Sequence, residues 1–130
     1  MEWTTELRYK RYEDWTEEEK KQIKENMANS PWHTHYHVEP KTGLLNDPNG
    51  FSYFNGKWIL FYQNFPFGAA HGLKSWVQLE SDDLVHFKET GLKVLPDTPL
   101  DSHGAYSGSA MQFDDKLFLF YTGNVRDENW

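Results

Sequence analysis

The residue best suited to chemistry lies in one short stretch, 43–50, which reads Gly-Leu-Leu-Asn-Asp-Pro-Asn-Gly. Its single acid, Asp47, stands between the amide of Asn46 and Pro48. Pro48 fixes its own φ and disfavours helix at Asp47, and Gly50 permits backbone conformations that other residues resist. We therefore expect a tight turn between two apolar segments that holds one carboxylate in a fixed direction. The plain alternative is an Asx-type turn without chemistry.

A second group of polar side chains precedes this stretch. His33, His35 and His37 alternate along the chain, so an extended backbone would place all three on one face. Such a run can bind a metal, but Glu39 is the only nearby candidate for a further ligand. We expect polar residues near a pocket rim here, and no metal or other cofactor.

Composition limits the class of protein. The chain has 130 residues, enough for one ordinary domain, and 17% of them are aromatic. The net charge of -7 argues against a nucleic-acid partner. There is no cysteine, and the first residues lack a basic region followed by an apolar run. We therefore expect no signal peptide, no membrane association and a cytoplasmic location.

The N-terminal part is predicted to be helical. Thr16 and Glu19 have the spacing of a capping box, within a helix expected over residues 13–29. Few of its positions are apolar, which is typical of a surface helix that buries a narrow stripe. We expect residues 1–31 to form a helical extension without chemistry, and residues 32–130 to form a β domain.

From residue 50 the pattern is typical of β-strands. Residues 51–54 and 57–63 flank Asn55-Gly56, which predicts a hairpin with a type I′ turn. Residues 75–80 predict a third strand, and residues 88–95 a short outer strand.

The pattern then repeats at an offset of 59 residues. A second predicted hairpin spans residues 109–121, and Asp47 aligns with Tyr106 in the segment that precedes it. Four-stranded units at this spacing indicate propeller blades, whose entering segments gather near the central axis. We therefore predict an all-β fold, with about two blades of a β-propeller after a short N-terminal helix. Because a propeller needs at least about four blades, we expect the sequence to be the N-terminal piece of a larger protein.

Four motifs, in order, resemble the invertase or β-fructofuranosidase family, glycoside hydrolase family 32. They are Leu-Asn-Asp-Pro-Asn-Gly at 45–50, Phe-Tyr-Gln at 61–63, Ser-Asp-Asp-Leu-Val-His-Phe at 81–87 and Tyr-Ser-Gly-Ser at 106–109. The match covers about residues 32–130. Within the family, the sequence most resembles the bacterial branch that acts on sucrose 6-phosphate.

The resemblance implies a five-bladed propeller with an axial pocket. It implies hydrolysis of terminal β-D-fructofuranosyl bonds in sucrose or sucrose 6-phosphate, with retention, and Asp47 as the nucleophile that forms a covalent fructosyl intermediate. The partner would be a small sugar. From the resemblance and from side-chain type, the expected substrate-binding residues are Leu44, Leu45, Asn46, Asp47, Gln63, His71, Trp76, Tyr106 and Ser107.

Two departures from the family pattern concern specificity. His71 stands where secreted members often have a Trp, and residues 76–79 read Trp-Val-Gln-Leu where many relatives have Trp-Gly-His-Ala. The segment 71–76 resembles the phosphosugar-hydrolysing branch. Lys74 or His71 could favour a phosphate, although a solvated loop charge is the commoner role.

A retaining glycosidase also needs a second carboxyl group, about 5–5.5 Å from the first. The acid/base Glu of the family has no match in this sequence. Arg126-Asp127 resembles the family's Arg-Asp-Pro motif, but Glu128 follows where Pro is expected. Asp97 and Asp101 are weak alternatives in a Pro-rich loop. We expect the chain alone to be inactive.

Two other functions fit the same residues. One is a non-catalytic carbohydrate-binding propeller with the same pocket. The other is a related glycosidase that acts on arabinan or fructan polymers, with different loops around the pocket.

Overall fold

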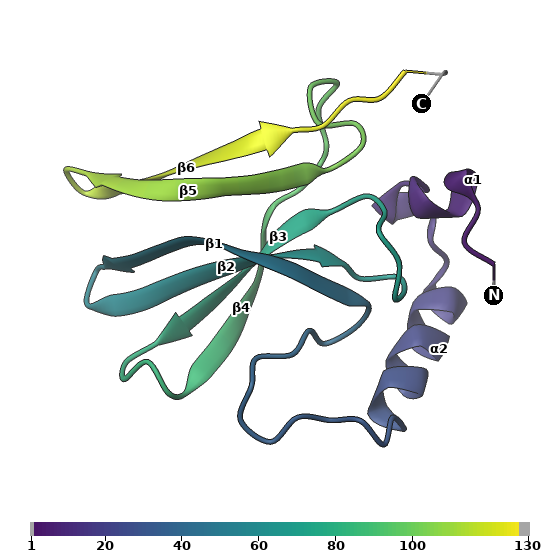
Figure 1. Cartoon of the computed structure of the whole chain (residues 1–130), viewed down its shortest axis with the longest axis horizontal. Helices are drawn as coiled ribbons and strands as arrows, with labels where there is room; N and C mark the ends of the chain where they lie inside the picture. Colours follow the sequence, from purple (N-terminus) through teal and green to yellow (C-terminus); the bar gives the residue numbers. More distant parts are fainter. Residues whose placement is uncertain (1, 128–130) are drawn as a thin grey trace.

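The computed structural model describes residues 2–127 and contains two short helices, one 3-10 turn and six strands (Figure 1). In chain order these are α1 (Thr5–Arg8), η1 (Tyr12–Asp14), α2 (Glu17–Ala28), β1 (Leu44–Phe54), β2 (Lys57–Phe65), β3 (Ser75–Ser81), β4 (Phe87–Val94), β5 (Ala105–Phe113) and β6 (Lys116–Gly123).

Strands β1 to β4 form one antiparallel sheet in sequential order. The predicted hairpin is confirmed: Asn55 and Gly56 have φ of 50° and 77°, as a type I′ turn requires. β2 and β3 are the most buried strands, so the sheet is solvent-exposed mainly at its outer strand and turns.

Strands β5 and β6 form a separate hairpin beside β1, on one face of the first sheet (Figure 1). Ile59, Phe61 and Trp76 from the sheet pack there with Ala105 of β5. One complete four-stranded blade followed by the first hairpin of the next is the arrangement that the repeat predicted. The all-β propeller fold is therefore confirmed.

The motif at 43–50 is not the tight turn that its Pro and Gly residues predicted. Residues 44–50 belong to β1, and two β-bulges interrupt its pairing with β2. Pro48 is tolerated because β1 has no second neighbour in its sheet, so its missing N–H breaks no ladder on that side. Bulged strand geometry, rather than a loop, sets the direction of the motif's side chains.

The N-terminal segment packs on the loop that joins β2 to β3. Trp15 is buried and stacks on Phe67 of that loop, with ring centroids 4.3 Å apart. The predicted capping box at Thr16 and Glu19 is present, but the α-helix begins at Glu17 rather than at residue 13. Trp15 lies just before the cap, so it anchors the helix from outside it.

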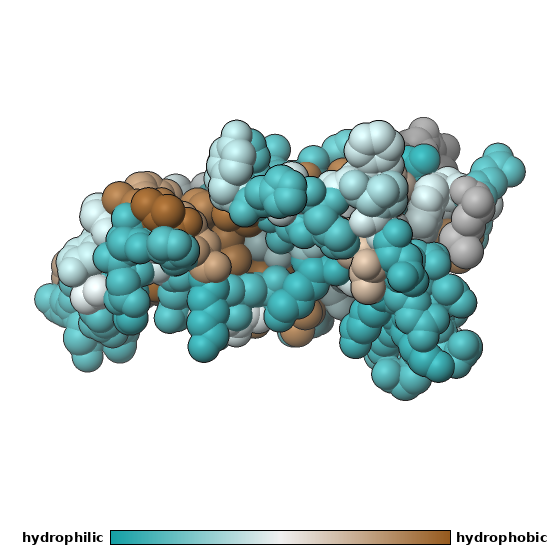
Figure 2. Space-filling view, turned by 90° about the horizontal axis from the view of Figure 1, so that it is seen from below, coloured by the Kyte–Doolittle hydropathy of each residue, from teal (hydrophilic) through white to brown (hydrophobic). Residues whose placement is uncertain are grey.

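On one face of the molecule, hydrophobic and hydrophilic side chains gather at different ends. Figure 2 shows hydrophobic side chains gathered mainly at the end away from the helices, whereas the helical end is hydrophilic. No helix within residues 2–127 is both long enough and apolar enough to cross a membrane.

Candidate active site

Asp47 lies at the centre of a small polar cluster made by two sheets. The Ser107 hydroxyl donates a hydrogen bond of 2.6 Å to Asp47 Oδ2, and the Gln63 amide donates one of 3.3 Å to the same oxygen. Gln63 also donates to Ser107 Oγ at 2.8 Å, which closes the triangle. A carboxylate, an amide and a hydroxyl from three strands therefore share one hydrogen-bond network.

A β-bulge in each sheet sets the direction of one side chain of this network, Asp47 in β1 and Ser107 in β5. In β1, Asn46 and Asp47 together face the single residue Gln63 of β2. In β5, Ser107 is the extra residue between the pairs that Tyr106 and Gly108 form with β6. A bulge redirects a side chain that regular pleating would place on the other face. The two strands thus present Asp47 and Ser107 to each other.

Asn49 ties these strands together and was not among the expected site residues. Its side chain is buried, donates to the Asp47 carbonyl at 2.9 Å and accepts from the Gly108 backbone N–H at 2.9 Å. The signal available in the sequence was its place in the motif at 43–50, but a second Asn beside a Gly is also common in turns. Asn49 fixes the backbone on both sides of the cluster.

The electrostatics of the cluster favour an ionised Asp47. The hydrogen bond from Ser107 lowers the pKa of the Asp47 carboxyl, and the positive charges of Lys74 and His71 act in the same direction. Partial desolvation opposes these effects without reversing them. The carboxyl stands on the exposed side of β1, ready for a reacting molecule.

Asn46 adds an unused acceptor next to Asp47. Its side-chain oxygen is buried and accepts no hydrogen bond within residues 2–127. A buried polar atom without a partner carries a desolvation cost that a ligand hydroxyl can relieve. Asn46 is therefore suited to bind a hydroxylated molecule held against Asp47.

Trp76 does not form the sugar-facing wall that we expected from its side-chain type. It is fully buried in the core between the two sheets, and its indole N–H donates to the Tyr106 carbonyl at 3.1 Å. The β-sheet pleat turns this residue inward, so it supports the backbone of Tyr106 and cannot contact a ligand. Tyr106 itself is half-buried and can.

The remaining expected contact residues differ in their surroundings. Leu44 packs against the helical cluster and Leu45 against the opposite face of the sheet. The Leu44 carbonyl accepts a hydrogen bond from Asn64. His71 is exposed, and its charge acts on Asp47. Of these three residues, only His71 has a side chain free of the core.

The weak alternatives for a second acid are elsewhere. Asp101 is fully buried and accepts hydrogen bonds from Thr98 and Tyr121, so it has a structural role. Asp97 lies in a separate hollow beside Arg11. Arg126 reaches the Tyr106 hydroxyl, and Glu128 lies outside the described residues.

The histidine run is not a strand, so the alternation expected of an extended segment does not apply to it. His33 contacts Glu39 at 2.9 Å in a segment of bends. Within residues 2–127, no three His, Asp or Glu side chains are grouped closely enough to hold a metal ion.

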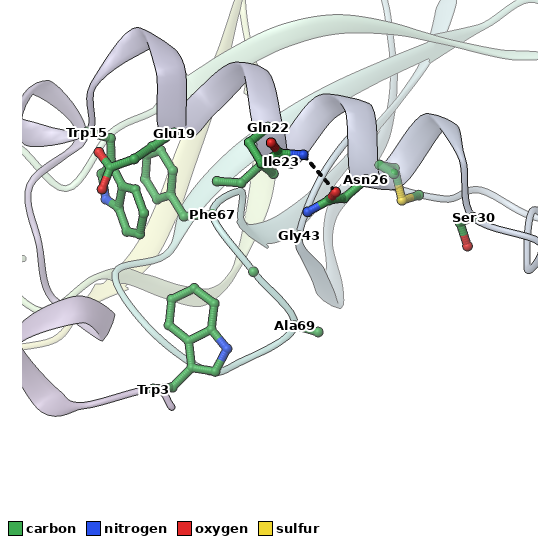
Figure 3. A pocket seen from close by; sticks show the side chains of 12 residues that line it. Trp3, Trp15, Glu19, Gln22, Ile23, Asn26, Ser30, Gly43, Phe67 and Ala69 are labelled. Carbon is green, nitrogen blue, oxygen red and sulfur yellow. Dashed lines mark hydrogen bonds between the residues drawn. The ribbon is translucent and has the colours of Figure 1, made fainter. Parts of the chain in front are cut away.

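A hollow with a volume of about 490 Å³ does not contain Asp47. It lies between α2 and the loop after β2, and Figure 3 shows Trp3, Trp15, Ile23 and Phe67 around it. Its one carboxylate, Glu19, is held by Lys10 and by the helix cap. This hollow is an apolar packing seam beside the helix and is separate from the polar cluster around Asp47.

Fold and cluster together define a β-propeller that presents a carboxylate beside amide and hydroxyl groups, as proteins that act on sugars require. Residues 37–130 match the glycosyl hydrolases family 32 N-terminal domain. The chain belongs to this family, as its motifs suggested.

Three similar proteins are informative. The chain is 77% identical over 124 residues to a sucrose-6-phosphate hydrolase of Streptococcus mutans, a match that covers 95% of this chain and 26% of that protein. The solved structure of a sucrose-6-phosphate hydrolase from Lactobacillus gasseri superposes with a TM-score of 0.93 at 53% identity, covering 99% of this chain and 26% of that one. A Bombyx mori family 32 β-fructofuranosidase, solved as a mutant in complex with sucrose, gives a TM-score of 0.69 at 32% identity over 88% of this chain and 25% of that one. The chain thus spans about a quarter of the length of these proteins.

Proposed function

We propose that the protein carrying this chain hydrolyses the terminal β-fructofuranosyl bond of sucrose or sucrose 6-phosphate with retention. The observation that carries the proposal is the ionised Asp47 carboxylate on the edge strand of the first sheet, held by the Ser107 hydroxyl at 2.6 Å and by Gln63. The names of the similar proteins support the same substrates.

In this mechanism Asp47 is the nucleophile. One carboxylate oxygen attacks the anomeric carbon of the fructosyl ring, while the bond from that carbon to the leaving-group oxygen breaks. The leaving oxygen takes a proton from a second carboxyl group, and water then hydrolyses the fructosyl ester with retention. Asn46 and Gln63 would hold sugar hydroxyls, and Ser107 would keep Asp47 ionised and aimed.

The second carboxyl group must come from another part of the protein. Within residues 2–127, no other carboxylate shares the hydrogen-bond network of Asp47. We therefore propose that a Glu outside this chain is the acid/base, and that the chain by itself does not turn over substrate.

We also propose that the protein is cytoplasmic. Its partner would be a small sugar, and not a nucleic acid or a membrane. Cell fractionation would check that location.

The deciding experiment is Asp47→Asn in the protein that carries this chain. Fructose release should fall on the order of 10⁴-fold, while sugar binding measured by calorimetry changes only a few-fold. Asp114→Asn is the control, because Asp114 lies in the exposed turn between β5 and β6. If the Asp47→Asn variant still hydrolyses the sugar, Asp47 is not the nucleophile. If the protein without any substitution binds sugar but does not hydrolyse it, the protein is a carbohydrate-binding propeller.

A further inference from the structure

The N-terminal extension contacts both of the loop segments that lead into the strands beside the candidate site. The family 32 match begins at residue 37, so the extension lies outside it. One loop segment, residues 66–74, joins β2 to β3, and the other, residues 95–104, joins β4 to β5. Neither segment has a strand ladder of its own, so the backbone groups that are buried there need partners elsewhere.

The extension supplies those partners just before β3. The Leu73 backbone N–H donates to the Arg8 carbonyl at 2.7 Å, and the Leu73 carbonyl accepts from the Tyr12 hydroxyl at 3.1 Å. Leu73 is fully buried, and Gly72 before it leaves room for the approach, because an added Cβ would lie 2.5 Å from the Arg8 carbonyl oxygen. Both backbone polar groups of Leu73 are therefore bonded to the extension.

The same extension holds the segment before β5. Arg11 Nη1 donates to the carbonyl of Pro96, a buried residue, at 2.9 Å. Further along this segment, the rings of Tyr9 and His103 meet edge to face, with centroids 5.0 Å apart. Three neighbouring residues of the extension thus reach one loop or the other, and the two loops are fixed relative to each other.

Hydrogen bonds between the two strand starts continue from these loops to the polar cluster. The Ala105 N–H donates to the Lys74 carbonyl at 2.8 Å, and the Trp76 indole N–H donates to the Tyr106 carbonyl at 3.1 Å. The next residue is Ser107, whose hydroxyl donates to the candidate nucleophile. The first residues of β5 are therefore held by β3, whose own start is held by the extension.

Ser107 depends on this support more than a regular strand residue would. It is the unpaired residue of a β-bulge, so no ladder partner of its own sets its direction. Its hydrogen bond to Asp47 Oδ2 is 2.6 Å long, and a reacting group displaced by about 1 Å can lose about 100-fold in rate. A small shift of the start of β5 would therefore lengthen the contact on which the aim of Asp47 depends.

We propose that Tyr12 and Arg11 of the N-terminal extension are positioning residues for the candidate site, because they hold the starts of β3 and β5 so that Ser107 meets Asp47. The inference rests on the proposed function and deepens it. It gives the extension a part in catalysis, in addition to its packing on the sheet.

The test uses Tyr12→Phe in the protein that carries this chain, because this substitution removes only the hydroxyl bonded to Leu73. The kcat for fructose release should fall by roughly 3- to 10-fold, the effect of one hydrogen bond, while KM changes by less than about 2-fold. The acidic limb of kcat/KM should move to higher pH, because a longer Ser107 contact lowers the pKa of Asp47 less. Tyr36→Phe is the matched control, because Tyr36 is 83% exposed and should leave all three values unchanged.

Amide hydrogen exchange gives a readout that does not need turnover. The Gly108 N–H is bonded to Asn49 at 2.9 Å, and exchange in residues 105–108 should become faster in Tyr12→Phe while β1 and β2 exchange as before. Faster exchange in every strand, with kcat and KM both altered, would mean that Tyr12 contributes only to general stability and would overturn the inference.

A second variant decides the matter if Tyr12→Phe does not fold. Arg11→Gln removes the donor to Pro96 and should give the same fall in kcat, the same shift in pH profile and the same local exchange. Unchanged values in the variant that folds would reject the positioning role. If the protein without any substitution hydrolyses neither sugar, the proposed function fails. Local exchange at residues 105–108 then decides by itself whether the extension holds Ser107 in place.

Discussion

At the scale of single residues, the proposed chemistry depends on how one carboxylate is kept charged while exposed. Asp47 stands on the solvent side of β1, where water alone would leave its pKa near the ordinary value. The Ser107 hydroxyl is the largest influence that lowers this pKa, ahead of the more distant charges of Lys74 and His71. A short directional contact to the ionised form outweighs screened charges at longer range.

Ser107→Ala should therefore make the proposed hydrolysis more sensitive to acid. Removing the hydroxyl raises the pKa of Asp47, so the proposed nucleophile is protonated at a higher pH and the acidic limb of kcat/KM moves upward. At the pH optimum the rate should fall by roughly 10-fold for one lost charge-assisted hydrogen bond. The pH–rate profile measures both effects. Ser109→Ala is the control, because Ser109 lies two residues further along the same strand, exposed and outside the cluster. If the acidic limb does not move in Ser107→Ala, the Ser107 hydroxyl is not what lowers the pKa of Asp47.

At the scale of elements, the two bulges of β1 determine where Asp47 lies and how closely the second hairpin approaches the strand. In the first, Asn46 and Asp47 together face Gln63. In the second, Gly50 has φ of 56°, and an added Cβ would lie 2.9 Å from the Phe61 ring and 3.2 Å from Ala110 of β5. Gly50 is required for its conformation and also for the close approach of the second hairpin.

Gly50→Ala should destabilise the fold by about 2–4 kcal/mol, because strain at positive φ adds to overpacking against both sheets. Gly56→Ala provides the comparison. Gly56 also has positive φ, at 77°, but an added Cβ would meet nothing within 4 Å, so only about 1 kcal/mol of strain is expected. Urea unfolding measures the difference, and equal losses in the two variants would mean that the contact with β5 is not important.

At the scale of the whole molecule, the N-terminal extension and the propeller sheet are joined by aromatic packing. Trp15, Phe65, Phe67 and Leu73 form one buried cluster, which Trp3, Leu7 and Ile23 border. This cluster lies under the loop that leads to Lys74. The stability of the extension and the position of the segment that leads into β3 are therefore linked.

Trp15→Ala should remove the main anchor of α2 and cost about 3–5 kcal/mol, the usual range for a fully buried Trp. Thermal unfolding gives this value, and faster amide exchange in α2 would locate the effect. Trp32→Ala is the matched variant, because Trp32 is 86% exposed and its loss should stay within about 0.5 kcal/mol. Similar losses for the two tryptophans would show that the extension is not anchored by Trp15.

Much of the fold follows from local patterns in the sequence. The capping box at Thr16, the Asn55-Gly56 turn and the alternating strands depend on neighbours within a few residues, and each appears in the structure. The short helix α1 was not predicted, because four residues give too little periodicity to recognise. The motif at 43–50 was expected to be a turn because Pro and Gly have the same local preferences in turns and in bulges.

The sequence by itself determined the family, the propeller strands and the identity of Asp47 as the acid to examine. Only the tertiary structure decided that Ser107, 60 residues away, donates to that acid, that Trp76 turns into the core and that Lys74 is buried beside Tyr106. The physical reason is that backbone preferences act locally, whereas the direction of a side chain on a bulged strand depends on the register between strands and on how two sheets pack.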